Sequence, residues 1–170
     1  YGLEQARRSI SQSKQALLTE GYADVLTLVQ FGFENACGVL GTSLTSAQVR
    51  RLSGLCTTVT LLFDGDRAGQ QAALRSAEMI LTAGLKVRVV CLPDGEDVDS
   101  LLRSQGKGAL QDLLHRAEEG LAFCLRMITT FEAPKDIMAW AVSFLQSLSQ
   151  AAWQAFDAAG IDPESIRSVD

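Results

Sequence analysis

Two aspartates end an apolar run in the middle of the chain. Asp64 and Asp66, separated by Gly65, directly follow "TVTLLF". Glu20 likewise follows the apolar run "QALLT", and the acidic loop "PDGEDVDS" follows "KVRVVCL". Carboxylates that lie close together repel one another unless a cation neutralises them, and oxygen ligands without His or Cys suit Mg²⁺ or Mn²⁺. These residues therefore predict metal-dependent phosphoryl or nucleotidyl chemistry, because such ions usually coordinate phosphates as well.

The Asp-x-Asp pattern also has a purely structural interpretation. Aspartates after a strand can form a turn and cap the next helix. A haloacid-dehalogenase-type phosphatase would be expected to carry D-x-D-G-T near its start, whereas two strand-helix units precede "DGDRAG" here. An EF-hand is excluded, since the loop lacks the third acidic ligand and the closing glutamate. The pattern alone leaves both metal binding and helix capping open.

Apolar strand-like runs alternate with helical patterns over the first part of the chain. This order predicts parallel strands joined by right-handed crossovers, with helices on both faces of the sheet. The carboxyl ends of parallel strands share one edge, where open α/β sheets bind ligands, so the acidic residues should converge there. The predicted strands are 15–19, 36–40, 58–63 and 86–92, and the predicted helices are 22–32, 45–55 and 68–84.

The fold class predicted is therefore α/β, with a mostly parallel four-stranded sheet followed by a helical subdomain. After about Asp97 the apolar residues recur at three- and four-residue spacing with almost no strand signal. We expect Trp140 and Trp153 in this region to be core residues.

Composition is ordinary for a soluble globular protein, with 47% hydrophobic and 21% charged residues. The apolar runs are shorter than the roughly 20 residues that cross a bilayer, so we expect a cytoplasmic protein, with reduced core cysteines and without membrane association. The first residue is Tyr1, which suggests excision from a longer chain. The net charge of −5 argues against a basic footprint over the whole surface. The local basic groups Arg7-Arg8, Lys14 and Arg50-Arg51 are interpreted as solvated helix faces.

Four ordered stretches carry a family resemblance: "YGLEQARRSISQSKQALLTEGYADVLTL", "GVLGTSLT", "LLFDGDRAGQQAALR" and "LPDGEDVDSLLRSQG". Together they resemble the TOPRIM (Rossmann-like) catalytic region of bacterial DnaG-type primases. The combination of "EGY", "DGDRAG" and "DGEDVD" separates the primase branch from topoisomerases, RecR-type proteins and small TOPRIM nucleases. The resemblance implies a TOPRIM domain over residues 1–108 and a helical subdomain of the polymerase core over 109–170.

The resemblance also implies roles for individual residues. Glu20 would be an acid/base group and a metal ligand. Asp24, four residues later, would be a supporting acid on the same helix-start face. The full set of implied metal ligands is Glu20, Asp64, Asp66, Asp97 and Asp99, with Glu20, Asp64 and Asp66 as the catalytic residues.

Loop residues at the same sheet edge complete the implied site. Gly65 and Gly69 would let the backbone approach a phosphate, and Arg67 would add a charge-assisted contact or be a solvated residue at the helix start. Gly41 and Thr42, in "GVLGTSLT", are expected to shape the loop.

The implied reaction is synthesis of a short RNA primer from ribonucleoside triphosphates on a single-stranded DNA template, with Mg²⁺ or Mn²⁺. A replicative helicase would bind through a region absent from this sequence. Zinc-ribbon cysteines and a basic N-terminal subdomain are absent from the sequence, so we expect the chain to be inactive or weakly active alone. A non-catalytic metal-binding or interaction module, and a TOPRIM nuclease, are the alternatives.

Overall fold

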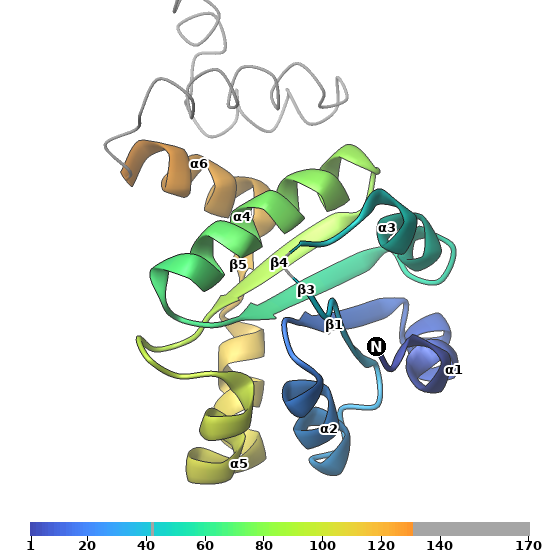
Figure 1. Cartoon of the computed structure of the whole chain (residues 1–170), viewed down its shortest axis with the longest axis vertical. Helices are drawn as coiled ribbons and strands as arrows, with labels where there is room; N and C mark the ends of the chain where they lie inside the picture. The colour runs from blue at the N-terminus through green and yellow to red at the C-terminus, as the bar shows by residue number, and fades with distance from the viewer. Residues whose placement is uncertain (42, 131–170) are drawn as a thin grey trace, which may run out of the picture. The chain divides into compact units, whose positions relative to one another are not determined.

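A computed structural model describes residues 1–41 and 43–130 of the chain (Figure 1). The strands form one sheet in the order β2-β1-β3-β4-β5, in which the first four are parallel and β5 runs antiparallel to β4. The elements in chain order are α1 (Leu3–Ser13), β1 (Gln15–Thr19), α2 (Tyr22–Gln30), β2 (Ala36–Gly38), α3 (Ser46–Ser53), β3 (Thr58–Phe63), α4 (Arg67–Thr82), β4 (Lys86–Cys91), α5 (Val98–His115), β5 (Glu118–Glu119) and α6 (Gly120–Thr130).

The predicted α/β class and mostly parallel sheet are confirmed, but the strand count is corrected from four to five. β5 contains only two glutamates, which are paired with Arg88 and Val89 of β4. A strand this short and polar has no alternation of apolar residues by which the sequence could reveal it. Helix α1 was also missing from the expected order of elements.

Helices cover both faces of the sheet, as Figure 1 shows for α4 on one face and for α2 and α5 on the other. On the α2–α5 face, the strand residues Leu17, Leu62 and Val90 share a core with side chains from both helices. The helix residues are Val25, Leu28, Val98, Leu101, Leu102 and Leu110. Leu28 lies three residues after Val25, and Leu101 and Leu102 lie three and four residues after Val98, which places each set on one side of its helix; Leu110 follows the break in α5 at Gly106.

Two expectations about burial fail. Val29 has the helical spacing of a residue on the same face as Val25 and Leu28, which predicts burial, yet it is 47% exposed, at a cavity between α1 and α2. Cys91 is exposed at the end of β4, whereas the other three cysteines are buried; none of the four is in a disulfide. No helix in the described part of the chain is long and apolar enough to cross a membrane.

A first compact unit runs from Tyr1 to Cys124, and residues 125–170 form a second unit. The predicted boundary between residues 108 and 109 lies within α5. Trp140, Trp153 and most of the predicted helical subdomain lie outside the described residues. The subdomain assignment for 109–170 therefore stays a prediction.

Candidate active site

The ends of β1 and β3 bring the first two predicted acids together. The strands are adjacent and in register, with Thr19 opposite Leu62. Glu20 and Asp64 follow these ends, and the backbone N–H of Asp64 donates a hydrogen bond to Oε1 of Glu20 at 3.2 Å. Both side chains are half-buried. The convergence that we predicted from strand order is thus present between these two residues.

Asp24 lies beside Glu20 but has a structural task. The backbone N–H of Gly21, at the N-cap of α2, donates to Oδ2 of Asp24 at 3.1 Å. This bond satisfies a backbone group that the helix start leaves without a partner. Asp24 is 7% exposed, so its carboxylate is held in place at the edge of the acidic group.

Asp66 is the N-cap of α4, because its Oδ1 accepts a hydrogen bond from the N–H of Gly69 at 2.7 Å. The capping interpretation of the Asp-x-Asp pattern is therefore correct for its second aspartate. Capping does not exclude metal binding, since it uses one carboxylate oxygen and leaves the other available. Asp66 is exposed and Asp64 is half-buried, so the two residues of the pair differ in environment.

The close approach of backbone atoms explains why the two glycines of "DGDRAG" have no side chain. A Cβ on Gly65 would lie 2.1 Å from the carbonyl oxygen of Pro93 and 2.6 Å from that of Leu92. A Cβ on Gly69 would lie 2.3 Å from the carbonyl oxygen of Asp64. The backbone that approaches these glycines is the protein's own, in the loop after β4 and at the end of β3. Their predicted contact with a phosphate stays a prediction.

The acidic loop after β4 separates the second pair of predicted ligands. Asp97 is the N-cap of α5, and its Oδ1 accepts from the N–H of Ser100 at 2.7 Å. The carboxylate of Asp99 instead accepts two hydrogen bonds from Nε of Arg103, at 2.8 and 2.9 Å, and one from the hydroxyl of Thr27. The structure therefore holds Asp99 in an ion pair with Arg103 on α5.

Electrostatics mark the group formed by Glu20, Asp24 and Asp64, whose pKa values are all raised. Burial is the first cause for each carboxyl. Repulsion adds to it: Glu20 feels Asp64, Asp66 and Asp24, and both Asp24 and Asp64 feel Asp97. Backbone hydrogen bonds oppose the shift at Glu20 and Asp24. Arg103, in contrast, lowers the pKa of Asp99 by hydrogen bonding.

We call Glu20, Asp24, Asp64, Asp66 and Asp97 the acidic cluster. In the described part of the chain, no basic side chain is among the groups that lower the pKa values of Glu20, Asp24 or Asp64, and a bound cation would supply that opposing charge. Within residues 1–41 and 43–130, however, no three His, Cys, Asp or Glu side chains come close enough to enclose an ion. The donor chemistry fits a hard divalent ion, and the side chains would have to move together to hold it.

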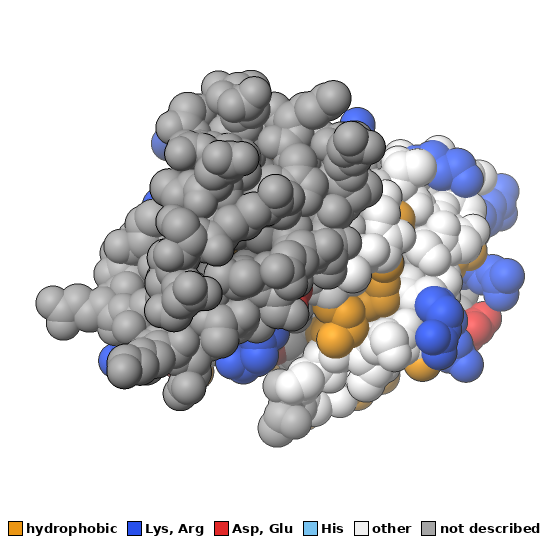
Figure 2. Space-filling view, turned by 90° about the horizontal axis from the view of Figure 1, so that it is seen from above, with side chains coloured by type: hydrophobic (Ala, Val, Ile, Leu, Met, Phe, Trp, Pro, Cys, Tyr) orange, Lys and Arg blue, Asp and Glu red, His pale blue; other side chains and the backbone are white. Residues whose placement is uncertain are grey.

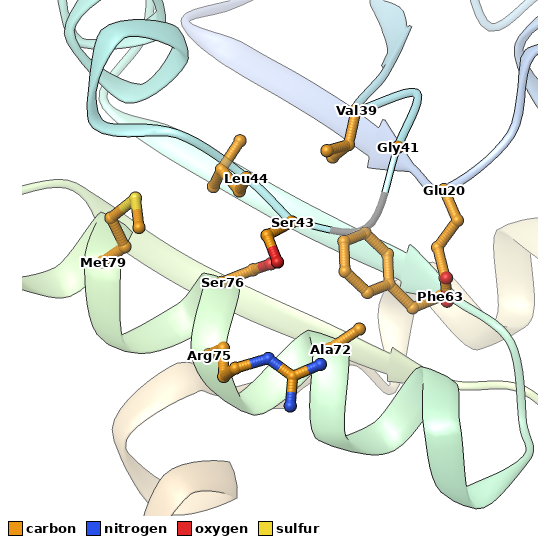
Figure 3. Close-up of a pocket in the computed structure, with 10 residues that line it drawn as sticks. All are labelled: Glu20, Val39, Gly41, Ser43, Leu44, Phe63, Ala72, Arg75, Ser76 and Met79. Carbon is orange, nitrogen blue, oxygen red and sulfur yellow. The ribbon is translucent and has the colours of Figure 1, made fainter. Parts of the chain in front are cut away.

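A pocket of about 180 Å³ opens beside Glu20 (Figure 3). The loop after β2 forms one wall with Gly41 and Ser43, and α4 forms the other. Gly41 has φ = 132°, a conformation that favours glycine and fits its predicted loop-shaping role. Its predicted neighbour Thr42 lies outside the described residues, and Arg67 is exposed in the first turn of α4.

Sequence reasoning missed two polar residues of this pocket, Arg75 and Ser76. They share the pocket wall with Ala72 and Met79, and Figure 3 shows the guanidinium of Arg75 extending beside Ala72. The four residues are spaced as one face of a helix. The sequence did contain a signal for them: Arg75 and Ser76 have the spacing that places them on the same helical face as Ala72 and Met79. A charged and a hydroxyl side chain on an otherwise apolar face indicate a polar pocket.

The raised pKa values predict how stability depends on pH in metal-free protein. Glu20, Asp24 and Asp64 bind protons in the folded state above their ordinary pKa values of 4.5, 3.8 and 3.8. The stability that these protons give is complete below the ordinary values and is lost as pH rises through the raised values. We expect melting temperatures in EDTA to fall across this window.

The variant Glu20→Gln should show a shallower fall, because one of the titrating groups is removed. Asp99, whose pKa is lowered from 3.8, changes its contribution only below that value and so does not mask the effect. Equal slopes for wild type and Glu20→Gln would contradict the assignment of coupled carboxyls.

Comparison with known proteins agrees with this architecture. Residues 17–102, about half of the chain, match the family model described as Toprim-like. A DNA primase from Chlamydia muridarum is 42% identical over 124 residues, which cover 72% of this chain and 21% of the relative. The chain thus spans about a fifth of the length of the curated relatives that it matches.

Solved structures give the same assignment. A DNA primase domain from Pseudomonas aeruginosa superposes with a TM-score of 0.81 and 29% identity, over 99% of this chain and 58% of that chain. A DnaG primase catalytic domain bound to single-stranded DNA superposes with a TM-score of 0.73 and 32% identity, over 87% of this chain and 51% of that chain. The chain therefore belongs to the Toprim-like family and corresponds to the Toprim-containing part of the catalytic core of DnaG-type DNA primases.

Proposed function

We propose that this chain carries the catalytic acids of an RNA polymerase that makes primers from ribonucleoside triphosphates on single-stranded DNA. The observation that supports the proposal is the acidic cluster at the carboxyl edge of the parallel sheet, where burial and mutual repulsion raise the pKa values of Glu20, Asp24 and Asp64. The match to primase catalytic cores makes template-directed nucleotidyl transfer the chemistry to expect of such a cluster.

Glu20, Asp64, Asp66 and Asp97 would hold Mg²⁺ or Mn²⁺, and such an ion would neutralise the negative charge of the triphosphate when bound. Asp99 would have to exchange Thr27 and Arg103 for the ion before it could join them. Asp24, as the supporting acid, would keep the start of α2 fixed through its bond to Gly21.

Glu20 would act on the proton of the attacking hydroxyl. The reaction joins the primer 3′-oxygen to the α-phosphorus of the incoming nucleotide and breaks the bond to the β-phosphate, so that pyrophosphate leaves. A carboxylate oxygen of Glu20 would accept the hydroxyl proton. Arg75, on the wall of the adjacent pocket, would contact the phosphates.

The other partners follow from the same proposal. The template would be single-stranded DNA, the substrate to which one of the similar primase domains is bound in its solved structure. A replicative helicase would bind to another part of the longer protein, and the reaction would take place in the cytoplasm.

A primer-synthesis assay, carried out with a longer protein that contains this chain, tests the proposal. The protein would be incubated with single-stranded DNA, labelled ribonucleoside triphosphates and Mg²⁺ or Mn²⁺, and the products separated by size. We expect short labelled RNA that requires both template and metal. Metal-dependent cutting of the DNA without incorporation of nucleotides would instead support a nuclease. The absence of both labelled RNA and cut DNA would support a non-catalytic module.

A further inference from the structure

Four arginines outside the acidic cluster form two pairs, one on α1 and one on α3. Arg7 and Arg8 lie on α1, and Arg50 and Arg51 lie on the last turn of α3. One member of each pair, Arg7 and Arg51, lines the same cavity of about 390 Å³. Figure 2 shows Lys and Arg side chains gathered on the side of the molecule where Figure 1 places α1 and α3.

A third cavity has lining residues in common with both this cavity and the pocket beside Glu20. The Glu20 pocket and the middle cavity share Val39 and Leu44 as lining residues. The middle cavity and the Arg7 cavity share Leu3 and Arg51. The three cavities therefore lie next to one another in a row past β2, the edge strand of the sheet, and we call this row the edge groove.

The charges along the edge groove suit a polyanion. Arg75, Arg51 and Arg7 line it in that order from the Glu20 end, and all three side chains are exposed. Within the described part of the chain, none of them forms an ion pair. Glu4 is the acidic residue that lines the far cavity. Guanidinium groups bind phosphates with paired hydrogen bonds, so a row of unpaired arginines matches a sugar–phosphate backbone.

We propose that the edge groove binds the phosphate backbone of single-stranded nucleic acid and carries that strand between Glu20 and the α1–α3 side of the molecule. The direction toward Glu20 rests on the proposed function, whereas the binding itself does not require catalysis. The net charge of −5 repels nucleic acid and so weakens its binding. We therefore expect weak affinity with a strong dependence on salt.

The chain provides a matched pair of double variants for the test. Arg7→Gln with Arg51→Gln removes two charges from the edge groove. Arg8→Gln with Arg50→Gln removes the same charge from the neighbouring position on each helix, and these two residues line none of the three cavities. Both double variants also remove one charge from the last turn of α3, so effects on its helix dipole are balanced.

Fluorescence anisotropy of a labelled oligodeoxythymidine, titrated with the 170-residue chain at several salt concentrations in EDTA, would measure binding. We expect the Arg7/Arg51 variant to lose about tenfold in affinity at low salt and to flatten the slope of log K against log[salt] by roughly 1.4, since a single strand contributes about 0.7 for each phosphate contact. The Arg8/Arg50 variant should lose much less. Equal losses in both variants, or no loss in the first, would overturn the proposal.

The strand in the edge groove would be either the DNA template or the RNA product. Repeating the titration with an oligoribonucleotide of the same length distinguishes the two. Stronger binding of DNA would assign the edge groove to the template, and stronger binding of RNA would assign it to the product; a loss in the Arg7/Arg51 variant with either probe supports the proposal. Failure of primer synthesis with an intact effect of Arg7 and Arg51 would reject the proposed function and leave the groove assignment standing.

Discussion

Replacing Gly65 by alanine is expected to destabilise the protein by about 3 kcal/mol, the upper range for overpacking a tight contact. The new Cβ would lie 2.1 and 2.6 Å from two backbone carbonyl oxygens in the loop after β4. Backbone cannot rotate away as a flexible side chain can, so the loops after β3 and β4 would have to separate. The hydrogen bond from the N–H of Gly65 to the carbonyl of Glu96, 3.2 Å long, would weaken with them.

Denaturant unfolding would measure this change as a shift of the midpoint at constant slope. Gly54→Ala is the control, because Gly54 has φ = −75° and its added Cβ would meet only the carbonyl of Arg51 at 3.6 Å. That variant should be neutral or stabilised by up to about 1 kcal/mol. If Gly65→Ala were as stable as Gly54→Ala, the two loops would not be in the contact described above.

The strands show where sequence periodicity is a sufficient guide. The predicted bounds 15–19 and 58–63 coincide with β1 and β3, because each apolar run is interrupted by polar residues at both ends. The predicted strand 36–40 continues two residues beyond β2, since Val39 is buried without being part of the strand. Burial and strand pairing are different properties, and the apolar pattern reports only burial.

The candidate site likewise has a part that the sequence predicts and a part that it does not. The predicted parallel arrangement of strands placed Glu20 and Asp64 at one edge of the sheet, but it did not show that β1 and β3 are neighbours. It could not show that Asp99 would bond to Thr27, a residue 72 positions earlier in the chain. Nor could it show that Arg75 would line the pocket beside Glu20, because that contact depends on how α4 packs beside the loop after β2. Side-chain partners across elements require the tertiary structure.

Divalent metal should stabilise the wild-type chain and leave Asp64→Asn unchanged. Binding to the folded state stabilises it by RT ln(1 + [M]/Kd), about 1.4 kcal/mol at a metal concentration ten times Kd, which raises the melting temperature by roughly 4 °C in a protein of this size. Asparagine keeps the backbone N–H that bonds Glu20 and removes one charge that raises the pKa of that residue. The metal-free variant should therefore be no less stable than wild type.

Thermal melts in EDTA and in Mn²⁺ would compare wild type, Asp64→Asn and the control Asp112→Asn, which changes an exposed aspartate of α5. The control should keep the full metal response, because Asp112 is not among the acids that raise the pKa values of the cluster. An equal response in all three proteins would reject the metal site, and Asp66 would then be only the cap that its bond to Gly69 already makes it. Loss of the response in Asp64→Asn alone would show that this carboxylate binds the ion, because Asp66 still caps α4 in that variant.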